Sequence, residues 1–278
     1  MNNSIFTGRR RRGKTTRAFS KAQERSSLIV VFDPKREFLG WPATCHSVRE
    51  VMDFIEDGHT VIIYHPDNVE EDFTALANFI WALHEFGMEH GWQNDPEHKP
   101  IVFLVDEAHQ LQSPNRINEA LKSILQKARP ELLVVFQTTQ SPAYLYSASK
   151  IANSEYYFFY TTHIPDLDRI SKLSGDSIAL EVASLRQNRY YVWFSEDDQT
   201  YELVTDSDSW DCDLIYKTEK EENSVPKQKI EVDDDFLSEL AKKVGKILKG
   251  NSNKEEKEDD GDAEGGFVLS FSKKKKED

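Results

Sequence analysis

Near its N-terminus the chain reads Gly8-Arg9-Arg10-Arg11-Arg12-Gly13-Lys14-Thr15-Thr16. The run from Gly8 to Thr15 matches the pattern G-x-x-x-x-G-K-[ST], in which glycines let the backbone wrap around a phosphate and N–H groups at a helix start bind its oxygens. A short apolar run precedes the segment at residues 4–7, and a helical pattern follows it over residues 14–24. Strand, loop and helix in this order are the context that the motif requires. The segment therefore predicts a phosphate-binding loop, with residues 8–16 around a bound nucleotide.

Side chains of this loop have predicted roles. We expect the Lys14 ammonium to neutralise the β- and γ-phosphates of ATP as a catalytic group, and the Thr15 hydroxyl to bind Mg²⁺. The four arginines from Arg9 to Arg12 leave two interpretations open. Either one or two of them contact phosphate or a neighbouring subunit's nucleotide, or most of them point to solvent.

A second motif is Ile101-Val102-Phe103-Leu104-Val105-Asp106-Glu107, an apolar strand pattern that ends in two carboxylates. This is the Walker B pattern, in which Asp106 is expected to hold Mg²⁺ through water and Glu107 to polarise the attacking water. The adjacent glutamate favours an ATPase that activates water over a kinase that shields its phosphate from water. The alternative is an ordinary strand-end pair that caps the next helix, which the upstream loop disfavours.

The body of the chain, residues 1–217, alternates between strand and helix patterns. Apolar runs predict strands at 4–7, 28–32, 60–64, 101–105, 132–136 and 156–160. Helical spacing of apolar residues predicts helices over 14–24, 70–91 and 115–128. Nearly continuous apolar strands indicate a mainly parallel central sheet flanked by helices, which is an α/β fold. Residues 190–195 and 200–205 predict a C-terminal β-hairpin.

From residue 218 to residue 278 the composition shifts to Lys, Glu, Asp, Ser and Asn, which predicts a charged, partly disordered tail. Within it, residues 233–250 predict an amphipathic helix that docks on its own body, on a neighbouring subunit or on a capsid or portal protein. The terminal run Phe267–Ser272 is rich in β-forming residues and precedes a lysine run. It either adds as a strand to a partner's sheet edge or is disordered, and the lysines alternatively contact DNA phosphates.

Composition excludes several classes of protein. The chain has 278 residues and a net charge of −14, which argues against a generally basic surface for nucleic acid but is compatible with a local basic strip. Two cysteines, Cys45 and Cys212, are too few for a disulfide framework or a zinc cluster. No apolar run approaches the roughly 20 residues of a membrane span, and the N-terminus lacks a secretion signal. We therefore expect a soluble, cytoplasmic protein with no membrane span.

Two further runs accompany the phosphate loop and the acidic pair. They are Phe32-Asp33-Pro34-Lys35-Arg36-Glu37-Phe38 and Val134-Val135-Phe136-Gln137-Thr138-Thr139-Gln140-Ser141-Pro142. The second run is similar to a strand that ends in Thr-Gln-x-Pro. Together with the phosphate loop and Val105-Asp106-Glu107-Ala108-His109, the two runs resemble the motifs of the FtsK–HerA superfamily of ring-forming, DNA-pumping ATPases. The resemblance covers residues 3–205. It implies a RecA-like P-loop NTPase of the additional-strand, catalytic-glutamate type.

The resemblance also implies roles for single residues. In that superfamily the glutamine at the strand end senses the γ-phosphate, and the matching residue here is Gln140. The alternative is a polar residue that closes the turn before Pro142. Asp33 is either an acid behind the site or a turn former before Pro34.

Members of the superfamily work as rings in which an arginine of one subunit reaches the nucleotide of the next. The resemblance therefore implies a homo-oligomeric ring, a pentamer or a hexamer, with double-stranded DNA as its partner. The candidate arginine fingers are Arg129 and Arg169, followed by Arg186 and Arg189. For each of them the alternative is a surface salt bridge.

The small size of the chain narrows the choice among the branches of the superfamily. We see no winged DNA-reading domain, N-terminal barrel or membrane span of the kinds that other branches carry, so the chain is most similar to the genome-packaging ATPases of membrane-containing icosahedral bacteriophages. This implies packaging of viral DNA into a preformed capsid, in the host cytoplasm or on the virion. The alternatives are a plasmid-transfer or repair motor of the same superfamily, a non-motor protein that uses ATP to set an assembly state, and a nucleotide kinase, which Glu107 and Gln140 disfavour.

Overall fold

The computed structural model describes residues 2–38, 40–146, 153–185 and 190–205. Several predicted features lie outside these ranges, namely the helix at 233–250, the terminal run at 267–272, Cys212, Arg186 and Arg189. They stay predictions.

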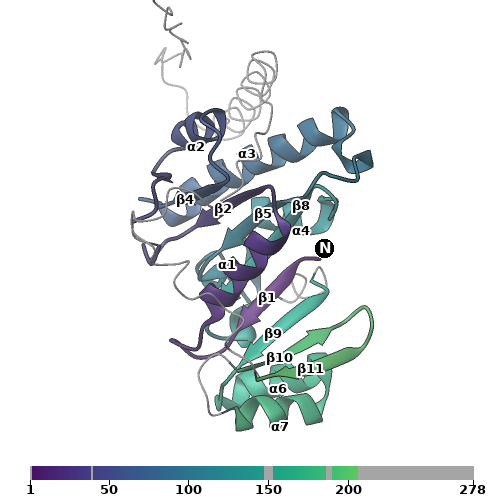
Figure 1. Ribbon diagram of the computed structural model, residues 1–278. Coiled ribbons are helices and arrows are strands. Elements are labelled where there is room, and N and C mark those ends of the chain that lie inside the picture. The colour runs from purple at the N-terminus through teal and green to yellow at the C-terminus, as the bar shows by residue number, and fades with distance from the viewer. Residues whose placement is uncertain (1, 39, 147–152, 186–189, 206–278) are drawn as a thin grey trace, which may run out of the picture.

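The described residues form a nine-stranded sheet (Figure 1). Its strands are β1 (Ser4–Thr7), β2 (Leu28–Phe32), β3 (Thr44–Cys45), β4 (Val61–Tyr64), β5 (Ile101–Val105), β8 (Leu133–Thr139), β9 (Glu155–Phe159), β10 (Tyr191–Ser195) and β11 (Thr200–Val204). Their order across the sheet is β11-β10-β9-β1-β8-β5-β2-β4-β3. The pairings are parallel except where β10 meets β9 and β11. The predictions of a mainly parallel sheet and of a hairpin at residues 190–205 are confirmed.

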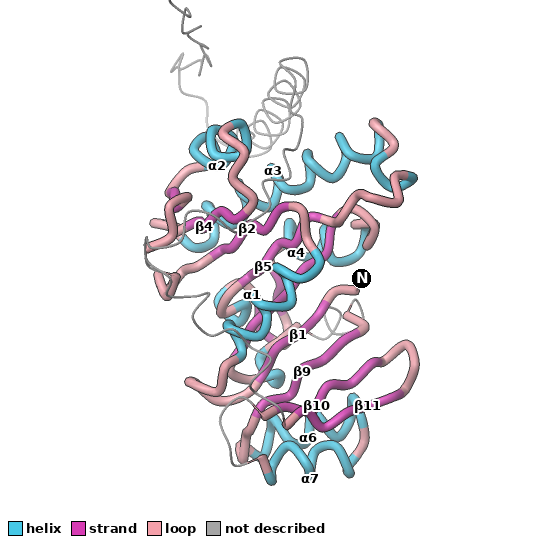
Figure 2. The backbone as a smooth tube through the Cα atoms, in the orientation of Figure 1, coloured by secondary structure: helices cyan, strands magenta, loops and turns pink. Residues whose placement is uncertain are grey.

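Helices cover both faces of the sheet (Figure 2). Alternate side chains of each strand point to opposite faces and divide the core in two. On one face α1 (Lys14–Arg25) packs Phe19 and Ala22 beside Phe38. The other face is covered by α2 (Val48–Glu56), α3 (Val69–Glu89), α4 (Glu119–Lys127), α6 (Ile164–Ser174) and α7 (Asp176–Ser184). None of the helices described is both long and apolar enough to cross a bilayer.

The remaining elements are small. A separate hairpin joins β6 (Gln112–Ser113) to β7 (Arg116–Ile117). Short 3₁₀ helices span Trp92–Asn94, Ala108–Gln110 and Pro142–Tyr144. The second and third of these directly follow the acidic pair and the Gln140 strand, so both site-bearing strands end in tight turns.

The helix predicted over residues 115–128 begins later than expected. In the structure α4 starts at Glu119, because the Asn118 side chain accepts hydrogen bonds from the N–H groups of Ala120 and Leu121 and caps the helix there. Residues 116–117 belong to β7 instead. The apolar spacing of Ile117 was therefore misleading, since its side chain reaches the core from a hairpin.

The strand predicted over residues 132–136 is longer than expected. β8 continues to Thr139, because its parallel pairing with β1 holds Thr138 opposite Phe6 and Thr139 opposite Thr7. This extension matters for function, because it places the polar side chains of Thr138 and Thr139 at the carboxyl end of the strand.

Gly8 is the point at which the loop leaves the sheet. Its φ is +141°, and a Cβ at this position would lie 2.6 Å from the carbonyl oxygen of Phe159 in β9. We expect Gly8→Ala to lower the free energy of unfolding by about 3 kcal/mol or more, from backbone strain and the clash together. Gly58→Ala is the matched control: its φ is +82° but nothing lies within 4 Å of the added carbon, so strain of about 1–2 kcal/mol is its only cost. Denaturant unfolding measures both, and equal losses would contradict the clash.

Candidate nucleotide site

The phosphate loop joins β1 to α1 and folds over the start of the helix. Gly13 has φ 93° in the left-handed region and stands immediately before Lys14, the first residue of α1. The Lys14 side chain turns back, and its Nζ donates a hydrogen bond to the carbonyl oxygen of Arg9 at 2.9 Å. The loop thereby sets the ammonium beside the N–H groups of the helix start, as a phosphate site requires.

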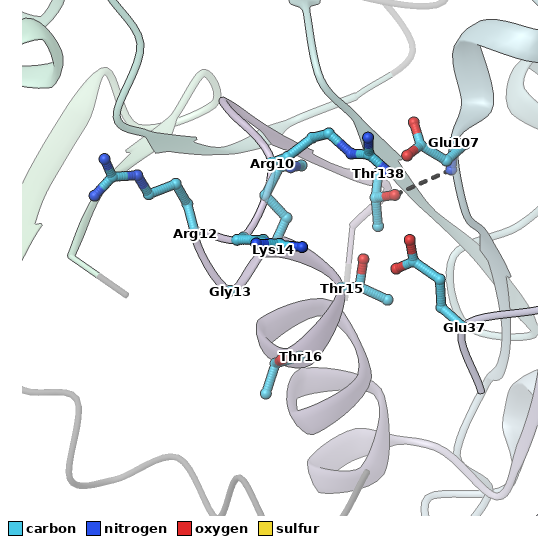
Figure 3. A pocket seen from close by; sticks show the side chains of 10 residues that line it. Arg10, Arg12, Gly13, Lys14, Thr15, Thr16, Glu37, Glu107 and Thr138 are labelled. Carbon is cyan, nitrogen blue, oxygen red and sulfur yellow. Dashed lines mark hydrogen bonds between the residues drawn. The ribbon is translucent and has the colours of Figure 1, made fainter. Parts of the chain in front are cut away.

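A pocket of about 350 Å³ opens above this loop (Figure 3). It is lined by Arg10, Arg11, Arg12, Gly13, Lys14, Thr15, Thr16, Glu37, Glu107 and Thr138. Gly8 and Arg9, which the sequence also predicts around the nucleotide, are not among the lining residues. In Figure 3 the Glu37 and Glu107 side chains lie on one side of the loop, whereas Arg12 extends to the other.

Burial changes the acid–base properties of the loop lysine. Lys14 is only 8% exposed. Burial lowers its pKa to about 8, against the opposing effect of the nearby carboxylates Glu107 and Asp106. A partly desolvated ammonium gains more from a bound phosphate than an exposed one would, because the phosphate replaces the lost hydration.

Asp106 stands at the end of β5 and is buried. Its Oδ1 accepts hydrogen bonds from the hydroxyl of Thr15 at 3.0 Å and from that of Thr138 at 2.6 Å. Burial raises its pKa to about 6, and the bond from Thr138 opposes the rise. The two residues that the sequence predicts as Mg²⁺ ligands are therefore in direct contact.

The second oxygen of Asp106 tests whether Mg²⁺ fits here. Its Oδ2 is buried and has no hydrogen-bond partner among the described residues. A carboxylate oxygen beside a hydroxyl is the kind of donor set that Mg²⁺ takes from proteins, with phosphate oxygens and water completing the octahedron. The described residues hold no group of three or more His, Cys, Asp or Glu that could bind a metal by itself. Thr15 and Asp106 therefore fit a Mg²⁺ ion that arrives with a nucleotide.

Glu107 is held by several partners. Its backbone is left-handed, with φ 50°, and its N–H donates to the hydroxyl of Thr138 at 3.1 Å. Its Oε1 accepts from Lys35 Nζ and, at 2.9 Å, from Gln140 Nε2, while its Oε2 lies 3.2 Å from His109 Nδ1. Burial favours a higher pKa, but the bonds from Lys35 and Gln140 outweigh it and lower the pKa of Glu107. The carboxylate is therefore ionised and fixed at the rim of the pocket.

Asp33 shapes the loop that carries Lys35 and Glu37 to the pocket. Its carboxylate is fully buried, accepts a hydrogen bond from the Phe38 N–H at 2.9 Å and lies 3.1 Å from His65 Nε2. These contacts close the turn after β2. Of the two interpretations of Asp33, the structure favours the turn former.

Lys35, Glu37 and Thr138 reach the site although the sequence suggested no role for them. Thr138 binds both acidic residues, Lys35 binds Glu107, and Glu37 lines the pocket. The signal that could have found them is their position at the carboxyl ends of neighbouring parallel strands, where side chains converge.

The loop arginines fall into two groups. Arg9, Arg10 and Arg11 are exposed, but Arg10 and Arg11 also line the pocket, so the structure leaves both interpretations of these side chains open. Arg12 is half-buried, and its guanidinium lies 4.6 Å from the centre of the Tyr160 ring. This stacking ties the loop to the chain that follows β9.

Of the four candidate arginine fingers, the structure describes Arg129 and Arg169, and neither lines the pocket of its own chain. Arg129 is exposed just before β8, at the end of that strand opposite to Gln140, and its N–H donates to His84 Nε2 at 3.1 Å. Arg169 is half-buried in α6. A finger acts on another subunit's nucleotide, so a position away from its own pocket suits the predicted role without testing it.

Comparison with known proteins gives matches in structure alone. No protein-family model matches the chain, and no curated protein sequence matches it. Among solved structures, the genome packaging NTPase B204 of Sulfolobus turreted icosahedral virus 2 in complex with sulfate has a TM-score of 0.58 at 16% identity, over 73% of this chain and 96% of that one. Its complex with AMPPCP has a TM-score of 0.56 at 18% identity, over the same shares of both chains.

A third match is B204 of Sulfolobus Turreted Icosahedral Virus, described as a DNA-packaging ATPase. Its TM-score is 0.53 at 18% identity, over 74% of this chain and 98% of that one. At such identities the likeness shows the fold. The chain has the P-loop NTPase fold of these viral NTPases, which is consistent with the FtsK–HerA superfamily that its motifs resemble.

Proposed function

We propose that this chain is an ATP-hydrolysing DNA translocase that works as a homo-oligomeric ring, a pentamer or a hexamer, and packages viral double-stranded DNA into a preformed capsid. The observation that carries the ATPase part is the convergence of Lys14, Thr15 and Glu107 on one pocket, with Asp106 hydrogen-bonded to Thr15. Packaging is supported by the fold shared with B204, a genome packaging NTPase.

The geometry supports the following course of hydrolysis. ATP lies with its β- and γ-phosphates on the loop, where Lys14 and the N–H groups at the start of α1 neutralise their charge. A water oxygen bonds to the γ-phosphorus while the bond from that phosphorus to the β–γ bridging oxygen breaks, and Glu107 takes the water proton. The products are ADP and inorganic phosphate. Mg²⁺ held by Thr15 and Asp106 supplies positive charge to the phosphates when it is bound.

Gln140 and Lys35 control how strong a base Glu107 is, because both contact its carboxylate. Both donate to Oε1 of Glu107 and lower its pKa, which weakens the carboxylate as a base, while its Oε2 keeps room for a water proton. Gln140 has an amide that can turn to the γ-phosphate, which agrees with a role as its sensor. We infer a low basal rate that rises when DNA or a neighbouring subunit draws Lys35 away.

The remaining parts of the proposal concern assembly. Arg129 or Arg169 supplies the finger to the neighbouring subunit. The predicted helix at 233–250 is the proposed contact to a capsid or portal protein. The protein would act in the host cytoplasm or on the virion.

The test is steady-state ATP hydrolysis of an assembled sample, with and without double-stranded DNA. We expect double-stranded DNA to raise kcat at least about tenfold, a change of 1.4 kcal/mol in the barrier. Hydrolysis that ignores DNA in a sample shown to be assembled would overturn the motor and favour the protein that uses ATP to set an assembly state. The same assay is repeated with empty capsids added. If DNA raises the rate of hydrolysis but capsids do not change it, a transfer or repair motor would be favoured instead.

A further inference from the structure

Among the strands that the structure describes, β11 is an edge of the sheet. Residues 200–203 are exposed and Val204 is half-buried. On an edge strand alternate N–H and C=O groups point away from the sheet and can pair with another strand. Within the described residues, β11 pairs with β10 alone. Edges of this kind are usually shortened, charged or covered. β11 has five residues and one charged side chain, Glu202, which stands opposite Trp193 on the face away from Tyr201 and Leu203.

Two large side chains extend the core onto this edge. Tyr201 stands opposite Phe194 and is 51% exposed, and Leu203 stands opposite Val192 and is 40% exposed. Both β10 partners are buried in the core under α6 and α7. A further strand beside β11 would cover Tyr201 and Leu203 and continue the same apolar layer.

We propose that residues Phe267–Ser272 of the same chain add to β11 as an antiparallel strand. Along this run Phe267, Leu269 and Phe271 alternate with smaller residues, two of which are serines. In an extended strand the three large side chains share one face. That face matches the layer formed by Tyr201 and Leu203, and the other face meets solvent on the far side of the sheet.

Charge selects the antiparallel direction. The hairpin tip between β10 and β11 carries exposed Glu196, Asp197 and Asp198. Within the described chain no lysine or arginine forms an ion pair with them. The run Lys273–Lys276 directly follows the peptide. An antiparallel strand places these lysines beyond Thr200, at the acidic tip, whereas a parallel strand places them at the opposite end.

The connection is long enough for the peptide to return to its own subunit. Residues 205–266 join β11 to the peptide, and extended they would span about 200 Å. To pair with β11, the peptide needs only to reverse its direction and run back alongside that strand. Tethering raises its local concentration at its own β11 above that of a second copy's peptide.

Hydrogen exchange of the full chain, read by mass spectrometry over residues 200–204, tests the pairing. Leu269→Asp puts a charge on the apolar face of the peptide, and Ser270→Asp is the matched control, with the same new charge one residue away on the other face. We expect β11 of the wild type and of Ser270→Asp to exchange at least about tenfold more slowly than β11 of Leu269→Asp. Equal exchange in all three proteins would overturn the proposal.

A mixing experiment tests whether the peptide belongs to the same chain. Wild-type chain labelled with ¹⁵N is assembled with an excess of unlabelled Leu269→Asp chain, and exchange is followed in the labelled β11. Protection that persists supports pairing within one chain. Protection that passes to the unlabelled β11 would show a peptide supplied by a neighbouring copy, and would overturn the intramolecular assignment.

Discussion

Glu107→Gln is expected to reduce kcat for ATP hydrolysis by about 10²–10⁴-fold, the contribution of a positioned general base. The substitution keeps the size of the side chain, and the amide oxygen can still accept a hydrogen bond from Gln140 or Lys35. What it removes is the ionised carboxylate, whose pKa those two residues lower. ATP binding is expected to persist or to tighten, because a negative charge leaves the pocket.

Single-turnover hydrolysis and equilibrium ATP binding separate these two effects. Glu119→Gln makes the same change in the exposed first turn of α4 and serves as the control. If Glu107→Gln kept a normal kcat while binding ATP normally, another group would have to activate the water, and the proposed role of Glu107 would be lost.

Lys14→Met is expected to weaken ATP binding by about 10- to 150-fold, from the 1.5–3 kcal/mol of a charge-assisted hydrogen bond. In the ligand-free protein, by contrast, the same substitution is expected to leave the free energy of unfolding unchanged or to raise it. Burial lowers the pKa of Lys14 to about 8, so the folded chain pays to keep this ammonium charged. Methionine fills similar space without that cost, and we expect unfolding of the ligand-free protein to need as much denaturant as the wild type or more.

Calorimetric titration with ATP and denaturant unfolding without it give the two readouts. Lys122→Met, on the surface of α4, is the control for loss of a lysine. Loss of stability together with loss of binding would contradict this account, because it would mean that Lys14 holds the loop together instead of serving the ligand.

The local parts of the site could be predicted from the sequence. The phosphate loop and the acidic pair are continuous runs in which backbone geometry and side chains act within a few residues of each other. The contact between Thr15 and Asp106 follows from their places beyond the carboxyl ends of two strands of one parallel sheet, β1 and β5. The role of Thr138 could not be predicted, because it depends on β8 lying between β1 and β5. The same holds for Lys35, which reaches Glu107 across the end of the sheet.

Some elements were missed for physical reasons that differ. α2 has only nine residues, but its capping box between Ser47 and Glu50 was a local signal that could have been used. α6 and α7 are short helices separated by Gly175, and each buries few apolar residues. Their pattern is too weak to predict alone, and the packing of the two helices against each other and of α7 against β10 decides it.

The place of β1 in the sheet has a consequence for synthesis on the ribosome. Among the described strands β1 emerges first, yet its neighbours β8 and β9 come from residues 133–139 and 155–159. At about 5–20 residues per second, the N-terminal strand waits about 8–30 s for both partners. Until then β2, β4 and β5 can pair among themselves, but β1 has no neighbouring strand to hold the start of the phosphate loop in place. A nascent chain therefore becomes able to hold a nucleotide late, once β9 has cleared the exit tunnel, although the loop that binds it was made first.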